Sequence, residues 1–448
     1  MNDADAFCEP NPWVGGVRLT AESRSTLASH YLDRLALTWR RRSKQITSYH
    51  HDFSDLLEWD SRILTYLDAL TLLEDQICQE GLERLDAPLL DEELFALTLV
   101  ALRTRDIPLS QACIGLVQAI PRLIGPYAAA LTWVRWVDCE AHLELWPKDN
   151  DHYLKLYLAA SAHYPVVISP QSIQHWVASL TPDPQVGIAT LRCGILRGEA
   201  EWTTHAQEWL DADHSGLRLA AAEALIVFGS TQARRDMLPV LRDLALDPRD
   251  PAVSENAARK LLTVTCNEGR ELIDALETDT DRQRLYLQAL GWTGEPAAIP
   301  RLSERLDDPR DARLAAAVIN ALLGTHPVRD GWQTEAQSQS DPSGDLSEAE
   351  DALPPPDPDA GLPWPDRERF SQWWHNQRHN WPENQRYLGG RPREHAALHD
   401  ILHQGVLAWR PQAAWHLQIV QRGRRFPWQA PTPHQKHHLA NCAERLHG

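Results

Sequence analysis

The sequence predicts an all-α protein in which helical hairpins stack into a solenoid, and two features of residues 216–327 support this prediction. Apolar residues there recur every three or four positions, which places them on one face of a helix. The first such set is Leu217, Ala220, Ala221, Ala224, Leu225 and Phe228. The pattern recurs, and two of its helices end at Gly291 and Gly324, which are 33 residues apart, about one two-helix repeat. Because a single hairpin cannot bury its apolar stripe, such hairpins stack on one another.

Glycine and proline predict where the helices of this stack begin and end. We expect Gly229 to end the first helix in a left-handed conformation, which glycine adopts without a Cβ clash. Pro239 is expected near the start of the next helix, where a first-turn N–H has no partner to lose. Leu285–Leu290 forms a further helix, and Pro300 opens the one after it. Asp-Pro pairs mark the junctions, at residues 247–248, 250–251 and 308–309.

Helices are also predicted upstream of these repeats. One starts near Ser25 and a second spans roughly residues 52–78, so residues 1–90 form an N-terminal helical segment. Residues 91–330 form the solenoid, and its earlier part has weaker turn signals. The helices expected in that part are Leu94–Leu102, Ser110–Ile120, Tyr127–Val137, Leu154–Ala162, Pro170–Leu180, Ile188–Leu196 and Thr203–Leu210.

The composition changes after residue 330. Residues 331–361 contain eight acidic residues, no basic ones and a crowd of prolines, which predicts an acidic, disordered linker. Residues 362–448 hold 7 of the 18 tryptophans and 10 of the 20 histidines, and predict a small helical C-terminal module. Its helices are expected from Pro365, over Glu394–Gly405 and over Pro411–Gln421, with a Gly-Gly turn in RYLGGRP.

Two levels of resemblance follow from these segments. The stretches LRLAAAEALIVFG and YLQALGWTGEPAAIPRLSERLDDP resemble HEAT-type repeats, a family of degenerate helical hairpins that mostly serve as protein-binding scaffolds. Three segments in order resemble a proteobacterial family of uncharacterised HEAT-like proteins often encoded near type VI secretion genes. They are TWRRRSKQITSYHHDFSDLLEWDSRILTYLDALTL, LGWTGEPAAIPRLSERLDDP and LPWPDRERFSQWWHNQRHNW followed by RYLGGRP. The resemblance implies handling of secreted toxins or their delivery apparatus, and no catalytic residues.

The charge of the chain favours a protein partner over nucleic acid. The net charge is −18, and residues 362–448 carry 12 Lys and Arg against 6 Asp and Glu, whereas residues 1–361 carry 32 against 56. So acidic a body repels phosphate backbones, which proteins bind through Lys and Arg. It fits a basic protein partner steered by opposite charge, or simply a surface that keeps the protein soluble. With no membrane-length apolar run and no signal-peptide pattern at Met1–Asp5, we expect a cytoplasmic protein and no membrane partner.

Motifs for enzyme chemistry are missing from the sequence, so we predict a protein that is not an enzyme and uses no cofactor. There is no phosphate-binding loop, dinucleotide fingerprint, HExxH or GxSxG. The Cys139-Glu140-Ala141-His142 stretch lacks a downstream PCxxC and is expected to be structural. The seven cysteines form no CxxC pair and are expected to pack in cores. His395, His399 and His403 share a helix face that could bind zinc, but without an Asp or Cys at ligand spacing we predict no metal site.

Six residues in the C-terminal module are the candidate partner-binding set, because tryptophan and arginine are enriched at interface hot spots. They are Trp373, Trp374, Arg378, Arg386, Arg391 and Arg393. The tryptophans also suit a small core, and the arginines could dock carboxylates of the chain's own acidic body or linker.

The leading functional hypothesis is a non-enzymatic scaffold that holds one protein partner on the concave face of the solenoid. Given the resemblance, we expect that partner to be a basic toxin effector or a secretion component, with this chain as immunity protein, chaperone or adaptor. A HEAT-type enzyme or effector acting on nucleic acid or a small ligand is the alternative, and would require a deep pocket or a basic groove. A purely structural scaffold is the third hypothesis. The sequence leaves the oligomeric state open.

Overall fold

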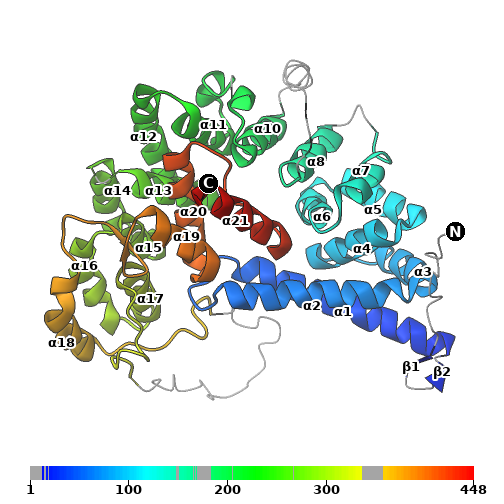
Figure 1. Cartoon of the computed structure of the whole chain (residues 1–448), viewed down its shortest axis with the longest axis horizontal. Coiled ribbons are helices and arrows are strands. Elements are labelled where there is room, and N and C mark those ends of the chain that lie inside the picture. Colours follow the sequence, from blue (N-terminus) through cyan, green and yellow to red (C-terminus); the bar gives the residue numbers. More distant parts are fainter. Residues whose placement is uncertain are drawn as a thin grey trace, which may run out of the picture. The chain divides into compact units, whose positions relative to one another are not determined.

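The protein is all-α, as predicted, with only two short hairpins of β-strand in the part that the structure describes (Figure 1). This computed structural model describes residues 13–14, 17–18, 20–147, 151–164, 166, 168, 183–203, 205–265, 267–334 and 357–447. Over these residues, none of the helices has the length and apolar character needed to cross a membrane.

The chain forms two compact units, each built from separate stretches of sequence. Unit 1 consists of Met1–Ile46, Ser54–Arg197 and Gln429–Gly448, and unit 2 consists of Thr47–Phe53 and Gly198–Trp428. The predicted boundaries after residues 90, 330 and 361 stay predictions about domain organisation. Of the predicted linker, 335–356 lie outside the described residues, whereas Trp332 and Asp359 are buried in unit 2.

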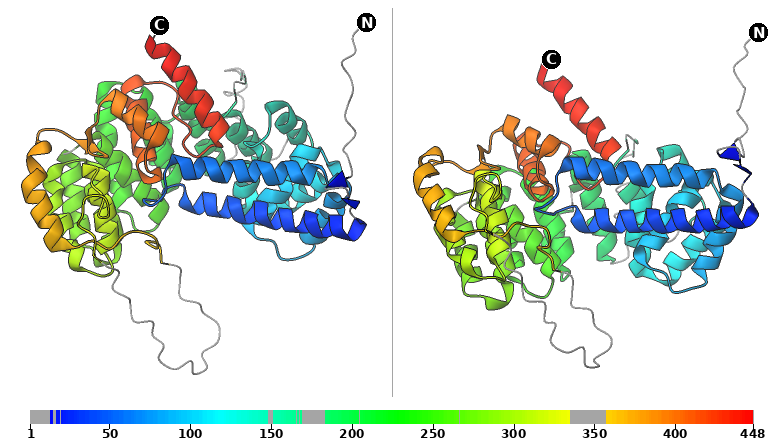
Figure 2. Two further views of the ribbon diagram at one scale, coloured as in Figure 1. Left: turned by 60° about the horizontal axis from the view of Figure 1, so that its bottom comes forward. Right: turned by 90° about the horizontal axis from the view of Figure 1, so that it is seen from below.

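Unit 1 is built around α4, whose residues Leu94–Leu102 are all buried. This helix packs against α1, α5, α6 and α7. Trp39 stacks on Phe95 of α4 with 4.3 Å between ring centroids. Figure 2 shows α1 and α2 side by side as a long pair. The elements of the unit are β1 (Trp13–Val14), β2 (Val17–Arg18), α1 (Ala21–Gln45), α2 (Phe53–Thr71), α3 (Glu74–Leu85), α4 (Asp91–Thr104), α5 (Ile107–Ala119), η1 (Pro121–Leu123), α6 (Ile124–Leu131), α7 (Trp136–Leu143), α8 (Asp151–Ser161), α10 (Pro184–Arg197) and α21 (Thr432–His447).

The C-terminal stretch joins unit 1 through a buried ion pair between α1 and α2. Arg42 Nε lies 2.5 Å from Asp60 Oδ1, and both side chains are almost fully buried. The Arg42 guanidinium also donates to the carbonyls of Gln429 and Ala430, at 3.1 and 2.8 Å. The Thr432 amide donates to Asp60 at 2.6 Å. These bonds satisfy both buried charges and fix the start of α21.

Unit 2 contains residues 216–327, whose helical periodicity led to the fold prediction. Its elements are η2 (Ala200–Thr203), η3 (Glu208–Asp211), α11 (Ser215–Phe228), α12 (Thr231–Leu246), α13 (Pro251–Val264), α14 (Asn267–Glu277), η4 (Thr280–Arg282), α15 (Gln283–Thr293), η5 (Pro296–Ala298), α16 (Ile299–Glu304), η6 (Arg305–Asp307), α17 (Ala312–Leu323), α18 (Arg367–Gln377), η7 (Arg378–Asn380), β3 (Tyr387–Leu388), β4 (Arg391–Pro392), α19 (His395–Gln404), η8 (Leu407–Trp409) and α20 (Arg410–Gln421). Helix α13 packs against α11, α12, α14 and α15, and α15 packs in turn against α17. Gly291 allows this last approach, because a Cβ there would lie 2.7 Å from Val318 Cγ1.

Several predicted helix ends are confirmed. Helix α17 stops at Gly324, which has a φ of 66°. Helix α13 starts at the 250–251 Asp-Pro pair, where the Asp250 side chain accepts from the Val253 amide and Pro251 is the first helical residue. The Gly-Gly turn is also confirmed, because Gly389 and Gly390 link β3 to β4 with φ of 62° and 77°.

Three predictions about turn residues in the repeats are wrong. Gly229 does end α11 as predicted, but it is extended rather than left-handed, with φ −68° and ψ 168°, because the chain passes directly into Ser230, which caps α12. Helix α15 continues past Gly291 and ends before Gly294, which takes the left-handed conformation with φ 72°. Pro239 lies inside α12 rather than near its start. The buried neighbours of Pro239 hold that helix together despite a cost of about 3 kcal/mol for an interior proline.

Three predicted helices upstream are also wrong in their extent. The one predicted over residues 52–78 is two helices, α2 and α3, separated by a turn at residues 72–73. The one predicted over Tyr127–Val137 is interrupted between α6 and α7, where Arg135 is extended and begins α7. The described part of Thr203–Leu210 contains 3₁₀ turns and no α-helix. The helix predicted over Pro170–Leu180 lies outside the described residues.

Candidate functional site

The predicted partner-binding tryptophans lie half-buried in unit 2. Trp373 and Trp374 project from α18 and pack against the hydrophobic core of the unit. Both rings also lie close to Trp381, with centroid distances of 5.8 and 6.1 Å. A role in binding a partner stays a prediction for both, and the contacts seen are those of a small aromatic core.

Two of the predicted arginines bind the chain's own helix ends. Arg386 donates from Nε to the Thr293 carbonyl at 2.5 Å and from Nη1 to the Thr263 carbonyl at 2.9 Å. Arg393 donates to the Trp292 carbonyl at 2.9 Å. The last carbonyls of a helix lack intrahelical donors and carry partial negative charge, so a guanidinium suits them. These two arginines therefore cap α13 and α15.

The other two predicted arginines lie at the surface. Arg391 pairs with Asp400 at 2.6 Å, and both side chains are more than half exposed. Arg378 begins η7 and is exposed. For these two, the structure leaves the side chains accessible, and their role in binding stays a prediction.

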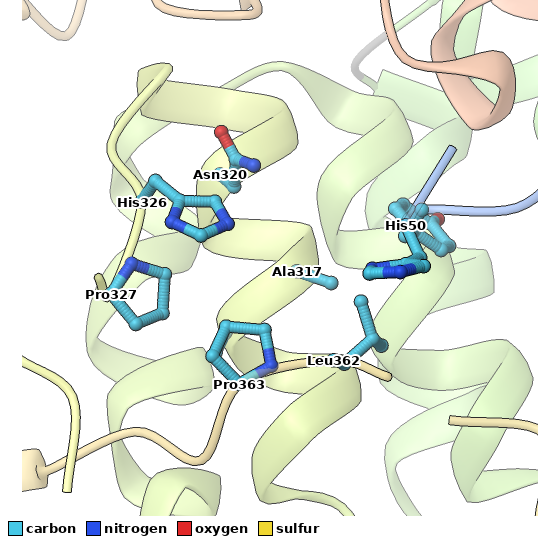
Figure 3. A pocket seen from close by; sticks show the side chains of 9 residues that line it. His50, Ala317, Asn320, His326, Pro327, Leu362 and Pro363 are labelled. Carbon is cyan, nitrogen blue, oxygen red and sulfur yellow. The ribbon is translucent and has the colours of Figure 1, made fainter. Parts of the chain in front are cut away.

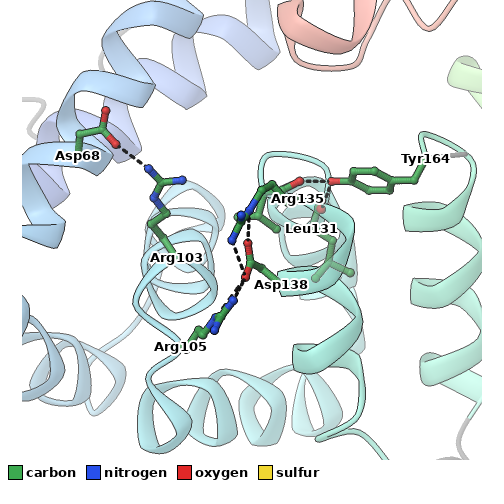
Figure 4. Close-up of polar contacts among 8 residues, drawn as sticks. Asp68, Arg103, Arg105, Leu131, Arg135, Asp138 and Tyr164 are labelled. Atoms are coloured by element: carbon green, nitrogen blue, oxygen red, sulfur yellow. Dashed lines mark hydrogen bonds and ion pairs between the residues drawn. The ribbon is translucent and has the colours of Figure 1, made fainter. Parts of the chain in front are cut away.

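Unit 1 contains an arginine site that the sequence analysis did not single out. Asp138, in the first turn of α7, accepts from Arg105 Nε and Nη2 at 3.1 and 2.6 Å (Figure 4). It also accepts from Arg135 Nε at 2.9 Å. Hydrogen bonds from both guanidinium groups outweigh the effect of partial burial and lower the pKa of Asp138. Asp138 is thus a charged anchor that orients two arginines.

The exposure of this site distinguishes it from a core ion pair. The side chains of Arg105 and Arg135 are 65% and 74% exposed, whereas that of Asp138 is 10% exposed. Ile107 and Val137, which adjoin these residues in the chain, are each 54% exposed. We call Arg105, Ile107, Arg135 and Val137 the arginine patch. Arginine is one of the residue types enriched at interface hot spots.

Backbone geometry helps to build the patch. Arg105 ends α4 with φ 57°, a left-handed conformation that non-glycine residues seldom adopt. In this conformation its side chain meets Asp138 in the first turn of α7. Nearby, Arg103 donates to Asp68 at 3.1 Å (Figure 4). The Tyr164 hydroxyl donates to the Leu131 carbonyl at 2.9 Å and so holds the end of α6.

Unit 2 contains a second site, with two arginines and two carboxylates. Arg284, at the start of α15, donates from Nη1 and Nη2 to the two oxygens of Asp359 at 2.9 and 2.8 Å. Arg313, at the start of α17, donates to the Asp359 carbonyl at 3.0 Å and pairs with the Asp357 carboxylate. Its guanidinium carbon lies 4.7 Å from the centroid of the Trp364 ring. We call Arg284 and Arg313 the carboxylate socket.

A small open hollow lies in the same unit (Figure 3). Its polar lining comes from Tyr49, His50, Asn320 and His326, and its apolar lining from Ala316, Ala317, Pro327, Leu362 and Pro363. Burial raises the pKa of the Tyr49 phenol, with a further contribution from Glu255. Burial also lowers the pKa of His326, so this imidazole is neutral near pH 7. The hollow is therefore a mostly uncharged space.

A buried charge cluster joins α11 and α13 of unit 2. Glu223 lies 3.3 Å from Lys260 Nζ and 3.1 Å from Arg425 Nη2. The Lys260 ammonium also lies 4.5 Å from the centroid of the Trp415 ring. Burial, together with the cations of Arg425 and Arg259, lowers the pKa of Lys260 to about 7 despite the attraction of Glu223. This cluster is enclosed, so it serves packing.

Cys139 and His142, at the ends of the stretch 139–142, are buried. Burial lowers the pKa of His142 to about 4 and raises the pKa of Cys139 to about 12. The His142 ring bonds to the Tyr127 hydroxyl, which also accepts from Trp146 Nε1 at 2.8 Å. A thiol held neutral is a poor nucleophile. Within the described residues, Cys78, Cys113, Cys139 and Cys193 form no disulfide, and no three His, Cys, Asp or Glu side chains cluster closely enough to hold a metal ion.

One signal in the sequence could have pointed to the carboxylate socket. Arg284 and Arg313 occupy the second position of two successive packed helices, α15 and α17. A basic side chain that recurs at the same position of packed helices forms a row of positive charge, and such a row suits the binding of an acidic segment. Comparison of the chain with protein-family models, with curated proteins and with solved structures found no match.

Proposed function

We propose that this chain is a non-enzymatic, HEAT-like solenoid that binds another protein in the cytoplasm. In this proposal the partner is a basic type VI toxin effector or its carrier, and the chain acts as an immunity protein, chaperone or adaptor. The observation that carries the binding role is the arginine patch. Its two guanidinium groups are more than 60% exposed yet held by one buried carboxylate.

The arginine patch is suited to binding because its side chains are already ordered. A flexible arginine loses rotamer entropy on binding, which costs about 0.5–1.5 kcal/mol for each immobilised side chain. Asp138 has fixed both arginines before a partner arrives. The Nη1 atoms of both arginines make no hydrogen bond to Asp138, so each guanidinium keeps donors for a partner carboxylate. Ile107 and Val137, close to these arginines in the sequence, are exposed apolar side chains.

Net charge and local contacts play separate parts in this proposal. The surplus of acidic residues in residues 1–361 would steer a basic partner towards the chain. At contact, the arginine patch would require a carboxylate from that partner. Because steering depends on screened charges, association should slow as salt rises, whereas the apolar contacts should persist.

The repeats of unit 2 support the solenoid part of the proposal. In α11 to α15, helices pack against their sequence neighbours and also against the helix two positions along. This contact pattern is the one expected of hairpins stacked in a row. Inner helices of such stacks commonly line a binding surface.

The test is affinity purification from the native host with the wild type and two variants. The binding variant is Arg105→Ala with Arg135→Ala, and the matched control is Arg122→Ala with Arg103→Ala, which are also exposed arginines of unit 1 paired to acids. We expect one protein, encoded beside the secretion genes, to co-purify with the wild type and the control and to be lost from the binding variant. Loss of no protein from the binding variant at low salt would contradict the proposal.

A further inference from the structure

Residues 357–361 fill the carboxylate socket of unit 2 with the chain's own acids. Asp359 is 4% exposed, and its carboxylate takes both terminal nitrogens of Arg284. The neighbouring residues 357, 358, 360 and 361 are exposed. Asp359 is therefore the residue that ties this turn to α15 and α17.

The backbone of this turn places the Asp359 side chain against Arg284. The Asp357 carboxylate accepts from the Asp359 amide at 2.9 Å, and the Asp357 carbonyl accepts from the Ala360 amide at 3.2 Å. Gly361 then has a φ of 89°, and a Cβ there would lie 3.2 Å from His50 Nε2. A residue with a side chain would be strained at this position. Asp-Pro-Asp followed by a glycine thus forms a compact acidic hook.

The segment that follows the hook is anchored by backbone hydrogen bonds and by apolar packing. Thr334 donates its amide to the Trp364 carbonyl at 3.0 Å, and Asp366 donates its amide to the Trp332 carbonyl at 2.7 Å. Trp332 is fully buried and Phe370 packs against it. Displacing the hook would leave this apolar anchor in place. Release of the hook would break the charged contacts with Arg284 and Arg313 but would expose little buried apolar surface.

We propose that the carboxylate socket is an exchangeable binding site for an acidic peptide segment of a partner protein. The chain's own Asp357-Pro358-Asp359 occupies it until a segment with two carboxylates at the same spacing replaces the hook. Arginine forks recognise carboxylates in this bidentate manner. This site lies in unit 2 and does not depend on the arginine patch of unit 1.

The experiment measures binding of a fluorescein-labelled peptide, DPDAGLPW, which copies residues 357–364. The full-length wild type is compared with the variant Asp357→Asn with Asp359→Asn, whose own hook lacks charge. A tethered competitor acts at an effective concentration in the millimolar range, so removing its charge should strengthen peptide binding by about tenfold or more. Adding Arg284→Gln and Arg313→Gln to that variant should abolish binding. An NPNAGLPW peptide should bind to none of these proteins.

Two outcomes would overturn the proposal. Absence of saturable binding to the folded Asn variant would make the hook an internal structural contact only. Equal binding of the two peptides, or equal binding to the wild type and the Asn variant, would place the peptide elsewhere. If the double variant fails to fold, Asp357→Asn alone serves, because the Asp357 side chain is 48% exposed. We expect this single variant to bind the acidic peptide more tightly than the wild type, and affinity equal to wild type would also overturn the proposal.

Discussion

Asp138 in unit 1 and Asp359 in unit 2 each lie at a site with two arginines, but the two sites work in opposite directions. At Asp138 the carboxylate belongs to a helix and the arginines reach into solvent, with 65% and 74% of their side chains exposed. At Asp359 the arginines belong to helices and the carboxylate arrives on a turn, where its side chain is 5% exposed. The arginine–carboxylate pairs therefore leave guanidinium groups exposed in unit 1, whereas in unit 2 they bury a carboxylate.

This difference shows that the role of an ion pair depends on which of its two residues is held in place by a helix. A fixed carboxylate turns mobile arginines into an ordered surface for a partner. Fixed arginines make a site that takes a mobile carboxylate. Glu223, held by Lys260 and Arg425 and 8% exposed, is the third case, in which all three groups are enclosed. The predictions below separate these three arrangements.

The largest loss of stability is expected at Glu223, because the charged groups around it are buried and cannot become hydrated when the carboxylate is removed. Glu223→Ala leaves the buried cations of Lys260 and Arg425 without their carboxylate, and should lower the free energy of unfolding by about 3–5 kcal/mol. Urea denaturation measures this change. Glu271→Ala, which removes an acid 66% exposed and paired with Arg242, is the control and should change stability by less than about 1 kcal/mol. Similar effects of the two variants would mean that the Glu223 cluster is open to water.

Lys260 should also make the stability of unit 2 depend on pH. Its pKa is about 7 in the folded protein, below the ordinary lysine value, so above pH 7 the unfolded state binds the additional proton. Stability should therefore rise with pH between 7 and 9, by up to about 1.4 kcal/mol per pH unit from this group. Lys260→Met removes the titrating group and should flatten this part of the curve. Parallel curves for the wild type and Lys260→Met would show that Lys260 keeps its proton in the fold.

Asp359→Ala should have an intermediate effect, because it removes a buried carboxylate from an arginine that can still reach water. Arg284 is 44% exposed, so it regains solvent when the hook is lost. We expect a loss of about 1–3 kcal/mol in the free energy of unfolding. Asp357→Ala, the exposed member of the hook, should cost less than about 1 kcal/mol. Thermal melts of both variants test the order, and a larger loss for Asp357→Ala would reverse the assignment of the anchoring acid.

Asp138→Ala should have a smaller effect on stability than Asp359→Ala, about 1 kcal/mol, since both arginines become fully hydrated. Its effect on binding should be larger, because Arg105 and Arg135 lose the group that orders them. The measurement is retention of the co-purified partner, with Arg103→Ala, which breaks the Asp68 pair, as the control. Retention by Asp138→Ala at the wild-type level would separate the arginine patch from partner binding.

The sequence predicted the fold class well because helical periodicity is a local property. The apolar spacing over 217–228 and the Asp250-Pro251 cap depend on residues within a few positions of one another. The errors occurred at residues whose conformation depends on contacts with other helices. Pro239 stays inside α12 because packing holds that helix, and Gly291 lies within α15 because Val318 of α17 approaches it there.

The two arginine sites were not predicted because their members are far apart in the chain. Arg105 and Asp138 are 33 residues apart, and Arg284 and Asp359 are 75 apart. The predicted set in the C-terminal module was chosen for composition, and composition does not separate an arginine that caps helix carbonyls, such as Arg386, from one that faces solvent. The hook did contain a signal, since an Asp-Pro-Asp sequence before a glycine is a turn with two acids on one side.

The most direct test of the contrast between the two sites is residue-resolved labelling of arginines with phenylglyoxal, followed by mass spectrometry. The wild type is compared with the variant Asp357→Asn with Asp359→Asn. We predict that Arg105 and Arg135 are labelled readily and at equal rates in both proteins. Arg284 and Arg313 should be protected in the wild type and become labelled several-fold faster in the variant, because their donors are released. Unchanged labelling of Arg284 and Arg313 would show that the hook does not occupy the socket, and would contradict the contrast between a presented and an occupied pair of arginines.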